Sequence, residues 1–160
     1  MLTGRNALVT GAGKGIGKAI AMELAANGAF VIVNYNGSKA AAEQTVAEIK
    51  EAGGDAVAYQ CNVADYKACA GMTADLIKSY AHIDILVNNA GITRDGLLMK
   101  MSEEDFDAVI DTNLKGCFNT IRHLSRYFLK QRAGKVINSA SVAGILGNAG
   151  QANYSASKAG

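Results

Sequence analysis

Three side chains near the carboxyl end of the sequence could together reduce a carbonyl group. Tyr154 follows Ser141 by thirteen residues, and Lys158 follows Tyr154 by four. Residues four apart lie on one face of a helix, so the ammonium group of Lys158 would stabilise a phenolate on Tyr154. A tyrosine assisted in this way can act as a general acid–base catalyst near neutral pH. Because Tyr-x-x-x-Lys alone is common in helices, its meaning depends on the rest of the sequence.

The length and composition of the chain predict a single domain that functions in solution. The chain has 160 residues, 49% of them hydrophobic, which is enough for a substantial core. The net charge of +2 is spread along the chain and no apolar run is long enough to span a bilayer, so we expect neither a nucleic-acid partner nor a membrane segment. The start does not resemble a signal peptide. Cys61, Cys69 and Cys117 lack metal-binding spacing, so we expect reduced thiols, no metal and a cytoplasmic protein.

Short apolar runs alternate with helical patterns along the chain. We expect strands at residues 6–10, 29–34, 56–60, 83–87 and 135–139. We expect helices at residues 16–27, 39–52, 65–80 and 102–131, with Gly134 ending the last one. The strands are rich in β-branched residues, as in strands buried on both faces. This alternation predicts an α/β fold with a doubly wound parallel sheet.

The turn between the first strand and the first helix is suited to binding a pyrophosphate. It reads TGAGKGIG over residues 10–17. It is not a P-loop and does not follow the strict G-x-G-x-x-G spacing. Even so, Gly11, Gly15 and Gly17 would let the backbone turn tightly and approach a phosphate at the helix N-terminus. A glycine turn made only for packing is the alternative.

Five motifs in a fixed order resemble those of the short-chain dehydrogenase/reductases, and this resemblance covers the whole chain. The motifs are Thr10-Gly-x-x-x-Gly15-x-Gly17, Asn88-Asn89-Ala90-Gly91, Asn113, Ser141 and Tyr154-x-x-x-Lys158. Residues 91–95, 109–114 and 150–160 look more narrowly like the 3-oxoacyl-[acyl-carrier-protein] reductases of bacterial fatty-acid synthesis. The resemblance implies a Rossmann-like dinucleotide-binding domain over residues 1–160.

The resemblance implies roles for four catalytic residues. Tyr154 would protonate the substrate carbonyl oxygen as hydride arrives from a nicotinamide, and Lys158 would also hold the nicotinamide ribose. Ser141 would donate a hydrogen bond to the substrate oxygen. Ser139 is a competing hydroxyl two residues earlier, on the same side of the strand. Asn113 would anchor a water that connects Lys158 to solvent, unless it is a buried amide that only satisfies backbone groups.

The segment after the second strand favours NADP(H) over NAD(H). NAD-binding folds place an acidic residue there to bind the ribose 2′-hydroxyl. This chain instead reads NYNGSK over residues 34–39, with no carboxylate to repel a 2′-phosphate. Lys14, Asn36 and Ser38 are the expected neighbours of that phosphate, unless Lys14 is only a solvated loop charge.

The other expected cofactor contacts come from the first turn, the loops after the third and fourth strands, and the catalytic pair. They are Thr10, Gly11, Gly13, Gly15, Ile16, Gly17, Asn62, Val63, Asn89, Ala90, Gly91, Tyr154 and Lys158. Asn62-Val63 departs from the family, which usually has Asp-Val. The asparagine can still accept a hydrogen bond from the adenine amino group.

The resemblance implies NADPH-dependent reduction of a 3-oxoacyl thioester on acyl carrier protein. Arg122, Arg126 and Lys130 recur every four residues and Arg132 follows them, which is typical of either a solvated helix face or a docking surface for an acidic carrier. Arg132 matches a docking position in the resembling reductases. An acetoacetyl-CoA reductase or another short-chain alcohol dehydrogenase is the alternative enzyme. A silent dinucleotide-binding module would not need the Ser–Tyr–Lys set.

The sequence also leads us to expect that the fold continues beyond Gly160. A sheet of strand order 3-2-1-4-5-6 needs a sixth strand, and the helix that carries Tyr154 has only six residues after it. The chain contains no proline, whereas the resembling enzymes carry a Pro-Gly near the nicotinamide. We therefore expect part of a longer reductase, a homotetramer when complete, with the edge of the fifth strand and its apolar faces uncovered here.

Overall fold

A five-stranded parallel sheet with the strand order β3-β2-β1-β4-β5 lies at the centre of the computed structural model, which describes residues 1–160. The strands are β1 (Asn6–Val9), β2 (Phe30–Tyr35), β3 (Asp55–Gln60), β4 (Ile85–Asn88) and β5 (Lys135–Asn138). The predicted doubly wound parallel sheet is confirmed. Its five strands follow the predicted order.

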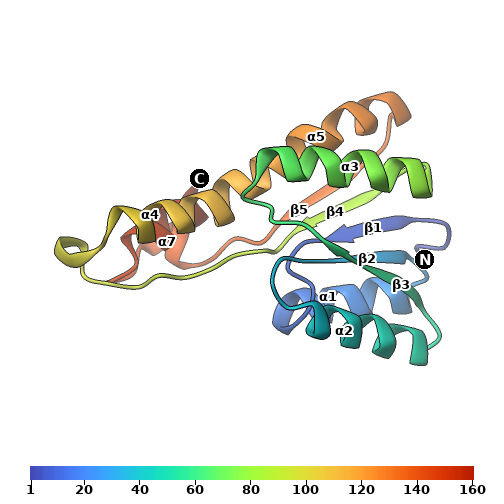
Figure 1. Cartoon of the computed structure of the whole chain (residues 1–160), viewed down its shortest axis with the longest axis horizontal. Coiled ribbons are helices and arrows are strands. Elements are labelled where there is room, and N and C mark those ends of the chain that lie inside the picture. Colours follow the sequence, from blue (N-terminus) through green and yellow to red (C-terminus); the bar gives the residue numbers. More distant parts are fainter.

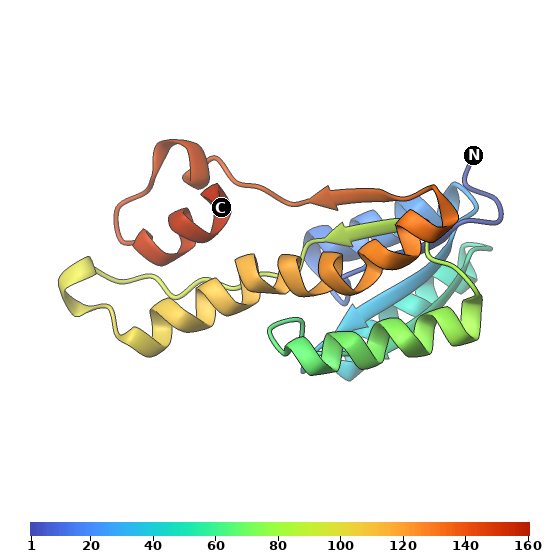
Figure 2. The same ribbon diagram turned by 90° about the horizontal axis from the view of Figure 1, so that it is seen from above.

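Helices cover both faces of this sheet (Figure 1). On one face lie α1 (Gly15–Ala26) and α2 (Lys39–Glu51), and on the other lie α3 (Tyr66–Tyr80) and α5 (Gly116–Gln131). The remaining elements are η1 (Leu98–Lys100), α4 (Glu103–Val109), η2 (Ile110–Lys115), α6 (Ala143–Leu146) and α7 (Ala152–Ala159). Figure 2 shows that α4, η2 and α5 form one long helical rod, which extends with α6 and α7 past the carboxyl ends of β4 and β5. None of the helices has the length and apolar character needed to cross a bilayer.

Two apolar cores fill the space between the sheet and its helices. Alternate residues of a strand point to opposite faces, which divides the buried side chains of β1 and β2 between the cores. Val9 and Val33 pack with side chains of α1 and α2. Leu8 and Ile32 pack with side chains of α3 and α5. Both faces of the central strands are therefore buried, as their continuous β-branched sequences predict.

The fifth strand differs from the central ones. β5 pairs only with β4, and all four of its residues are exposed, including Val136 and Ile137, whose exposed fractions are 41% and 51%. β5 is therefore the exception to burial on both faces, because no element packs on its outer side. Its open edge and its uncovered apolar faces were both expected.

The long helical rod begins and ends where it was predicted to, but a different residue ends it. The hydroxyl of Ser102 accepts a hydrogen bond from the amide of Asp105 at 3.0 Å, which caps the rod. Its end is set by Arg132, which adopts a left-handed backbone conformation (φ 54°, ψ 27°). Gly134, the predicted breaker, instead lies against the ring of Phe128, where an added Cβ would be 2.5 Å from the ring. The prediction that Gly134 ends the helix is therefore wrong.

Candidate active site

A cavity of about 780 Å³ lies at the carboxyl edge of the sheet, a usual place for ligands in open α/β folds. The loops that follow β1, β2, β3 and β4 line it. The lining residues from these segments are Gly11, Lys14, Gly15, Ile16, Gly17, Asn34, Asn36, Cys61, Asn62, Val63, Ala64, Asn89, Ala90, Gly91, Ile92 and Arg94, and the helical rod adds Ala108, Asp111 and Thr112. Most of the predicted cofactor contacts therefore surround one space.

The glycine turn is shaped by close approach to the loop after β4. Gly11 and Gly15 have left-handed backbones, with φ of 62° and 58°. A Cβ added to Gly17 would lie 2.4 Å from Nδ2 of Asn89 and 2.5 Å from the carbonyl oxygen of Gly11. The helix α1 that follows has no side-chain cap and no acidic residue in its first turn. Its first N–H groups and the positive end of its dipole therefore suit an anion such as a phosphate.

Thr10 holds the loops after β1 and β4 together. Its side chain is buried, and its hydroxyl oxygen accepts hydrogen bonds from the amides of Asn89 and Ala90, both at 3.0 Å. The side-chain amide of Asn89 in turn donates to the carbonyl oxygens of Thr10 and Gly11 at 3.0 and 3.2 Å. Thr10 does not line the cavity, and its contacts indicate a positioning role, while its predicted direct cofactor contact stays a prediction.

Asn34 connects three of the loops that line the cavity. Its exposed fraction is 1%, and its Nδ2 donates to the carbonyl oxygen of Cys61 at 3.1 Å. Its Oδ1 accepts a hydrogen bond from the amide of Gly11 at 3.3 Å. Sequence reasoning used Asn34 only as a position without an acid. The signal that it missed was a polar side chain within an apolar strand.

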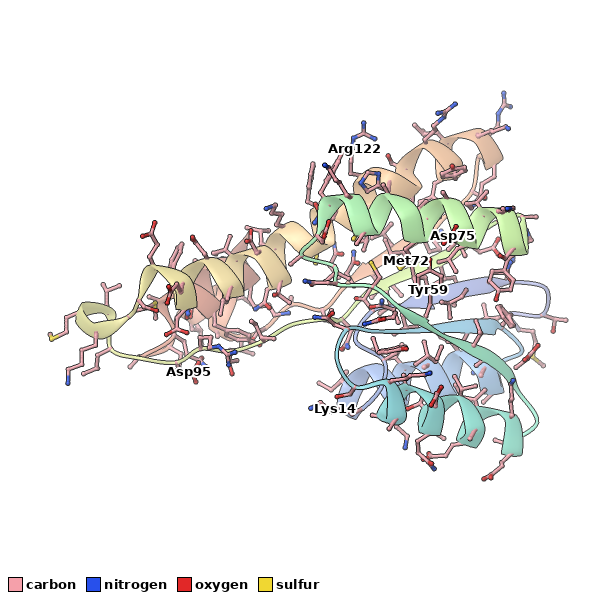
Figure 3. The ribbon with its side chains drawn as sticks, viewed as in Figure 1. Lys14, Tyr59, Met72, Asp75, Asp95 and Arg122 are labelled. Carbon is pink, nitrogen blue, oxygen red and sulfur yellow. The ribbon has the colours of Figure 1, made fainter.

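The predicted 2′-phosphate neighbours divide into two groups. Lys14, labelled in Figure 3, and Asn36 line the cavity, and Lys14 forms no ion pair with any carboxylate. Ser38 precedes α2, is exposed and does not line the cavity. Gly13 is also outside the lining, because it packs against α2, where an added Cβ would be 3.3 Å from the amide nitrogen of Ala42.

Tyr154 and Lys158 line a smaller hollow of about 270 Å³ next to this cavity. We call this space the catalytic hollow, and it shares Ile16, Asn89, Gly91 and Ile92 with the larger cavity. The Nζ atom of Lys158 lies 5.9 Å from the centre of the Tyr154 ring and donates a hydrogen bond of 2.6 Å to the carbonyl oxygen of Ser139. The ammonium group therefore lies over the ring of Tyr154, as their spacing on one face of α7 predicts, while its hydrogen bond goes to Ser139.

The two competing serines lie in different surroundings. Ser139 lines the catalytic hollow. Ser141 does not line it, and its hydroxyl oxygen accepts a hydrogen bond of 3.2 Å from the amide of Ala143, at the start of α6. The catalytic assignment of Ser141 stays a prediction, and Ser139 stays its alternative.

Asn113 connects the loop after β4 to α7. It is buried within the π-helical turn η2, a distortion that is frequent at functional sites. Its Oδ1 accepts from the amide of Ile92 at 2.8 Å, and its Nδ2 donates to the carbonyl oxygen of Ile92 and the hydroxyl of Ser157, both at 3.0 Å. The Ser157 hydroxyl donates to the carbonyl oxygen of Tyr154 at 2.8 Å. The backbone-satisfying role of Asn113 is thus present in the structure.

The arrangement agrees with comparisons to known proteins, in which the family model of the short chain dehydrogenases matches residues 5–160. The chain belongs to the short chain dehydrogenase family. Members of this family are oxidoreductases that bind a nicotinamide dinucleotide. The left-handed glycines and the uncapped α1 at the cavity fit the phosphates of such a group.

Individual relatives narrow the comparison further. The chain is 54% identical to the 3-oxoacyl-[acyl-carrier-protein] reductase FabG of Staphylococcus aureus, over 98% of this chain and 63% of that protein. It is also 54% identical to the 3-oxoacyl-[acyl-carrier-protein] reductase of a Synechocystis species, over 99% of this chain and 64% of that protein. The crystal structure of a short chain dehydrogenase from Mycobacterium avium matches with a TM-score of 0.93 and 46% identity, over 99% of this chain and 60% of that one. The chain thus spans less than two thirds of the length of these relatives.

Asn153 is a positioning residue of this short chain dehydrogenase that sequence reasoning missed. Its side chain is fully buried, and its Oδ1 accepts a hydrogen bond of 2.7 Å from the amide of Tyr154. Its Nδ2 donates to the carbonyl oxygens of Arg94 at 2.9 Å and Asp105 at 3.2 Å. The start of α7 is therefore fixed to two distant segments. The only sequence signal was an amide side chain directly before Tyr154.

Replacing Asn153 by Ala is expected to destabilise the protein by about 1–3 kcal/mol, because buried hydrogen-bonding groups lose their partner. Urea unfolding followed by circular dichroism measures the change. Asn148→Ala is the matched control, since Asn148 is exposed and its side chain bonds only to that of Gln151, so its effect should stay within about 0.5 kcal/mol. Equal effects of the two substitutions would contradict the positioning role.

Proposed function

We propose that the protein to which this chain belongs reduces a 3-oxoacyl thioester, carried on acyl carrier protein, to the 3-hydroxyacyl thioester with NADPH. The observation that carries the proposal is the pair formed by Tyr154 and Lys158 in the catalytic hollow, next to the glycine-lined cavity. The 54% identity to the reductase of Staphylococcus aureus supports this choice of substrate.

The residues of the chain divide the proposed reaction between them. The bound nicotinamide supplies the hydride. Tyr154 donates its phenolic proton to the carbonyl oxygen, and the ammonium group of Lys158 stabilises the phenolate that this leaves. Lys158 is held in place by the carbonyl oxygen of Ser139. The hydroxyl of Ser141, or of Ser139 in the alternative assignment, donates a hydrogen bond to the charge that develops on the substrate oxygen.

Asn113 holds the catalytic residues in position without lining the catalytic hollow itself. It binds both backbone groups of Ile92, in the loop after β4, and the Ser157 hydroxyl on α7. This connection fixes the loop that lines both spaces relative to the helix that carries the catalytic pair. A water anchored at Asn113, which would return a proton to Lys158, belongs to this proposal as well.

NADP(H) is the cofactor that the end of β2 and the side chain of Lys14 favour. The end of β2 supplies Asn34 and Asn36 to the cavity, so no carboxylate stands there to repel a 2′-phosphate. The carbonyl oxygen of Asn36 accepts a hydrogen bond of 3.1 Å from the side chain of Gln60, which holds this loop beside β3. Lys14 adds an unpaired positive charge at the same cavity.

Replacing Asn36 by Asp is expected to raise the Kd for NADPH at least about tenfold, because like-charge repulsion and desolvation cost more than about 1.4 kcal/mol at such a site. The Kd for NADH should change little or fall. Fluorescence titration with both cofactors measures the ratio, and Asn148→Asp controls for the added charge alone, since Asn148 lines neither space. A protein that already prefers NADH before any substitution would contradict this interpretation.

The carrier of the acyl group is tested by comparing two thioesters. Arg122, Arg126, Lys130 and Arg132 are exposed and form no ion pairs, and Figure 3 shows Arg122 projecting outward from α5. An acidic acyl carrier protein docked there would give a higher kcat/KM for acetoacetyl-acyl carrier protein than for acetoacetyl-CoA, and salt would reduce the difference. Equal kcat/KM values at low salt would favour the alternative, an acetoacetyl-CoA reductase. A homotetramer of the complete protein is part of the same proposal.

A further inference from the structure

Thr45 is a fully buried residue of α2 whose hydroxyl reaches the glycine turn. Its Oγ1 atom lies 3.1 Å from the carbonyl oxygen of Gly13 and 3.1 Å from that of Ala41, one turn earlier in α2. The hydroxyl has one hydrogen, which these two carbonyl oxygens share. A threonine inside a helix often bonds to the carbonyl oxygen four residues back, so the contact with Ala41 is ordinary. The contact with Gly13 is different, because it joins α2 to the turn.

The peptide unit between Gly13 and Lys14 depends on this contact. The Thr45 hydroxyl is its only hydrogen-bond partner within the chain, since the Lys14 amide donates to no other residue. Lys14 stands between two glycines, Gly13 and Gly15, whose backbones can adopt many conformations. Because a peptide unit is planar, a fixed Gly13 carbonyl also fixes the amide and the Cα of Lys14. Thr45 therefore restrains the part of the turn from which the Lys14 side chain leaves.

The same face of α2 is held against α1, which lies beside it on one side of the sheet (Figure 1). Glu48 follows Thr45 by three residues and so lies on that face. Its carboxylate accepts a hydrogen bond of 2.7 Å from the Nζ atom of Lys18, in α1. This ion pair joins the two helices one turn away from Thr45. Thr45 thus binds the turn from a helix whose own position is fixed.

We propose that Thr45 is a positioning residue for the choice of cofactor, which keeps Lys14 at the larger cavity by holding the carbonyl group of Gly13. This step rests on the proposed function, in which the ammonium group of Lys14 meets the 2′-phosphate of NADP(H). Lys14 lines the cavity and forms no ion pair, so its charge is free for such a contact. NADH has no 2′-phosphate. Loss of the Thr45 hydroxyl should therefore weaken the binding of NADPH more than that of NADH.

Two substitutions of Thr45 separate its hydrogen bond from its packing. Thr45→Val keeps the shape and removes the hydroxyl, and the Kd for NADH divided by the Kd for NADPH should fall about two- to tenfold, the factor that one net hydrogen bond contributes. Thr45→Ser keeps the hydroxyl and loses a methyl group from the core, so it should unfold at a lower urea concentration and keep the Kd ratio. Fluorescence titration with both cofactors measures the ratio. An equal fall in the serine variant would overturn the proposal.

Thr73→Val is the matched control. Thr73 is also a buried threonine inside a helix, α3, but its hydroxyl has no hydrogen-bond partner and it lines neither the larger cavity nor the catalytic hollow. Its substitution should leave the Kd ratio unchanged, and a fall like that of Thr45→Val would overturn the proposal. If Thr45→Val is too unstable to titrate, Thr45→Ala removes the same hydroxyl with a better helix former and should give the same lower ratio.

A double variant tests whether Thr45 acts through Lys14. Lys14→Ala should itself lower the Kd ratio, and adding Thr45→Val should lower it no further, because the charge that Thr45 positions is gone. Fully additive effects would overturn this route. An unaltered protein that binds NADH more tightly than NADPH would contradict the proposed cofactor, and this role with it. A preference for NADPH that stays unchanged in Thr45→Val and Thr45→Ala would contradict the role of Thr45 alone and leave the proposed function standing.

Discussion

Tyr154→Phe is expected to lower the turnover of the proposed reduction by about a hundred- to ten-thousandfold, the usual contribution of a general acid. The substitution removes one oxygen and keeps the ring in the catalytic hollow beside Lys158. The loops that line the larger cavity do not depend on this hydroxyl. NADPH should therefore bind almost as before, and a fluorescence titration beside the turnover assay with an acetoacetyl thioester separates the two effects.

Tyr127→Phe is the matched control for this experiment. Tyr127 lies on α5 and lines neither the cavity nor the catalytic hollow, so its substitution should leave turnover close to that of the unaltered protein. If Tyr154→Phe keeps most of its turnover, another group supplies the proton and the proposed mechanism is wrong. If NADPH binding is lost along with turnover, the substitution has disturbed the cavity.

The sheet could be predicted because its signals are local. Each strand is an apolar run bounded by turn residues, and alternation with helices allows few topologies. The predicted ends differ from the observed ones by one or two residues, as for β4, predicted at residues 83–87 and observed at Ile85–Asn88. The β-branched sequence of β5 alone would suggest burial on both faces, yet its faces are exposed, because burial depends on neighbours that a strand's own sequence does not describe.

The helical rod contains two features that local sequence signals did not predict. The predicted helix at residues 102–131 did not include the π turn η2, since apolar spacing continues through it. The turn places Asn113 against Ile92, a contact between segments 21 residues apart. The left-handed Arg132 was also missed, because arginine carries no signal for that conformation, whereas Gly134 does.

The motifs of the candidate site could be predicted from the sequence, whereas the hydrogen bonds that connect its segments could not. Tyr154 and Lys158 share a helix, so their spacing alone places them together. The amides that hold the site have partners far along the chain: Asn153 bonds to the carbonyl oxygen of Arg94, 59 residues away. Asn34 bonds to Gly11 and Cys61 across the sheet edge. Such partners depend on the assembled fold, which spacing in one sequence does not contain.

Gly17→Ala is expected to abolish measurable NADPH binding and to destabilise the protein by about 1–3 kcal/mol. The new Cβ would lie 2.4 Å from Nδ2 of Asn89, 2.5 Å from the carbonyl oxygen of Gly11 and 3.0 Å from Cα of Ala12. Two of these atoms are backbone, and Asn89 is held by its bonds to Thr10 and Gly11, so the turn itself has to move. A displaced turn no longer presents the start of α1 to a phosphate.

Gly71→Ala is the matched control for Gly17→Ala. Gly71 is also inside a helix, α3, but has no atom within 4 Å of an added Cβ. Alanine there should raise the free energy of unfolding by about 0.5–1 kcal/mol, since it loses less backbone entropy on folding. Urea unfolding should therefore show a lower free energy of unfolding for Gly17→Ala and a higher one for Gly71→Ala. NADPH titration should show a binding defect in Gly17→Ala alone. If Gly17→Ala still bound NADPH normally, the close packing of the turn on Asn89 would not be what shapes the cofactor site.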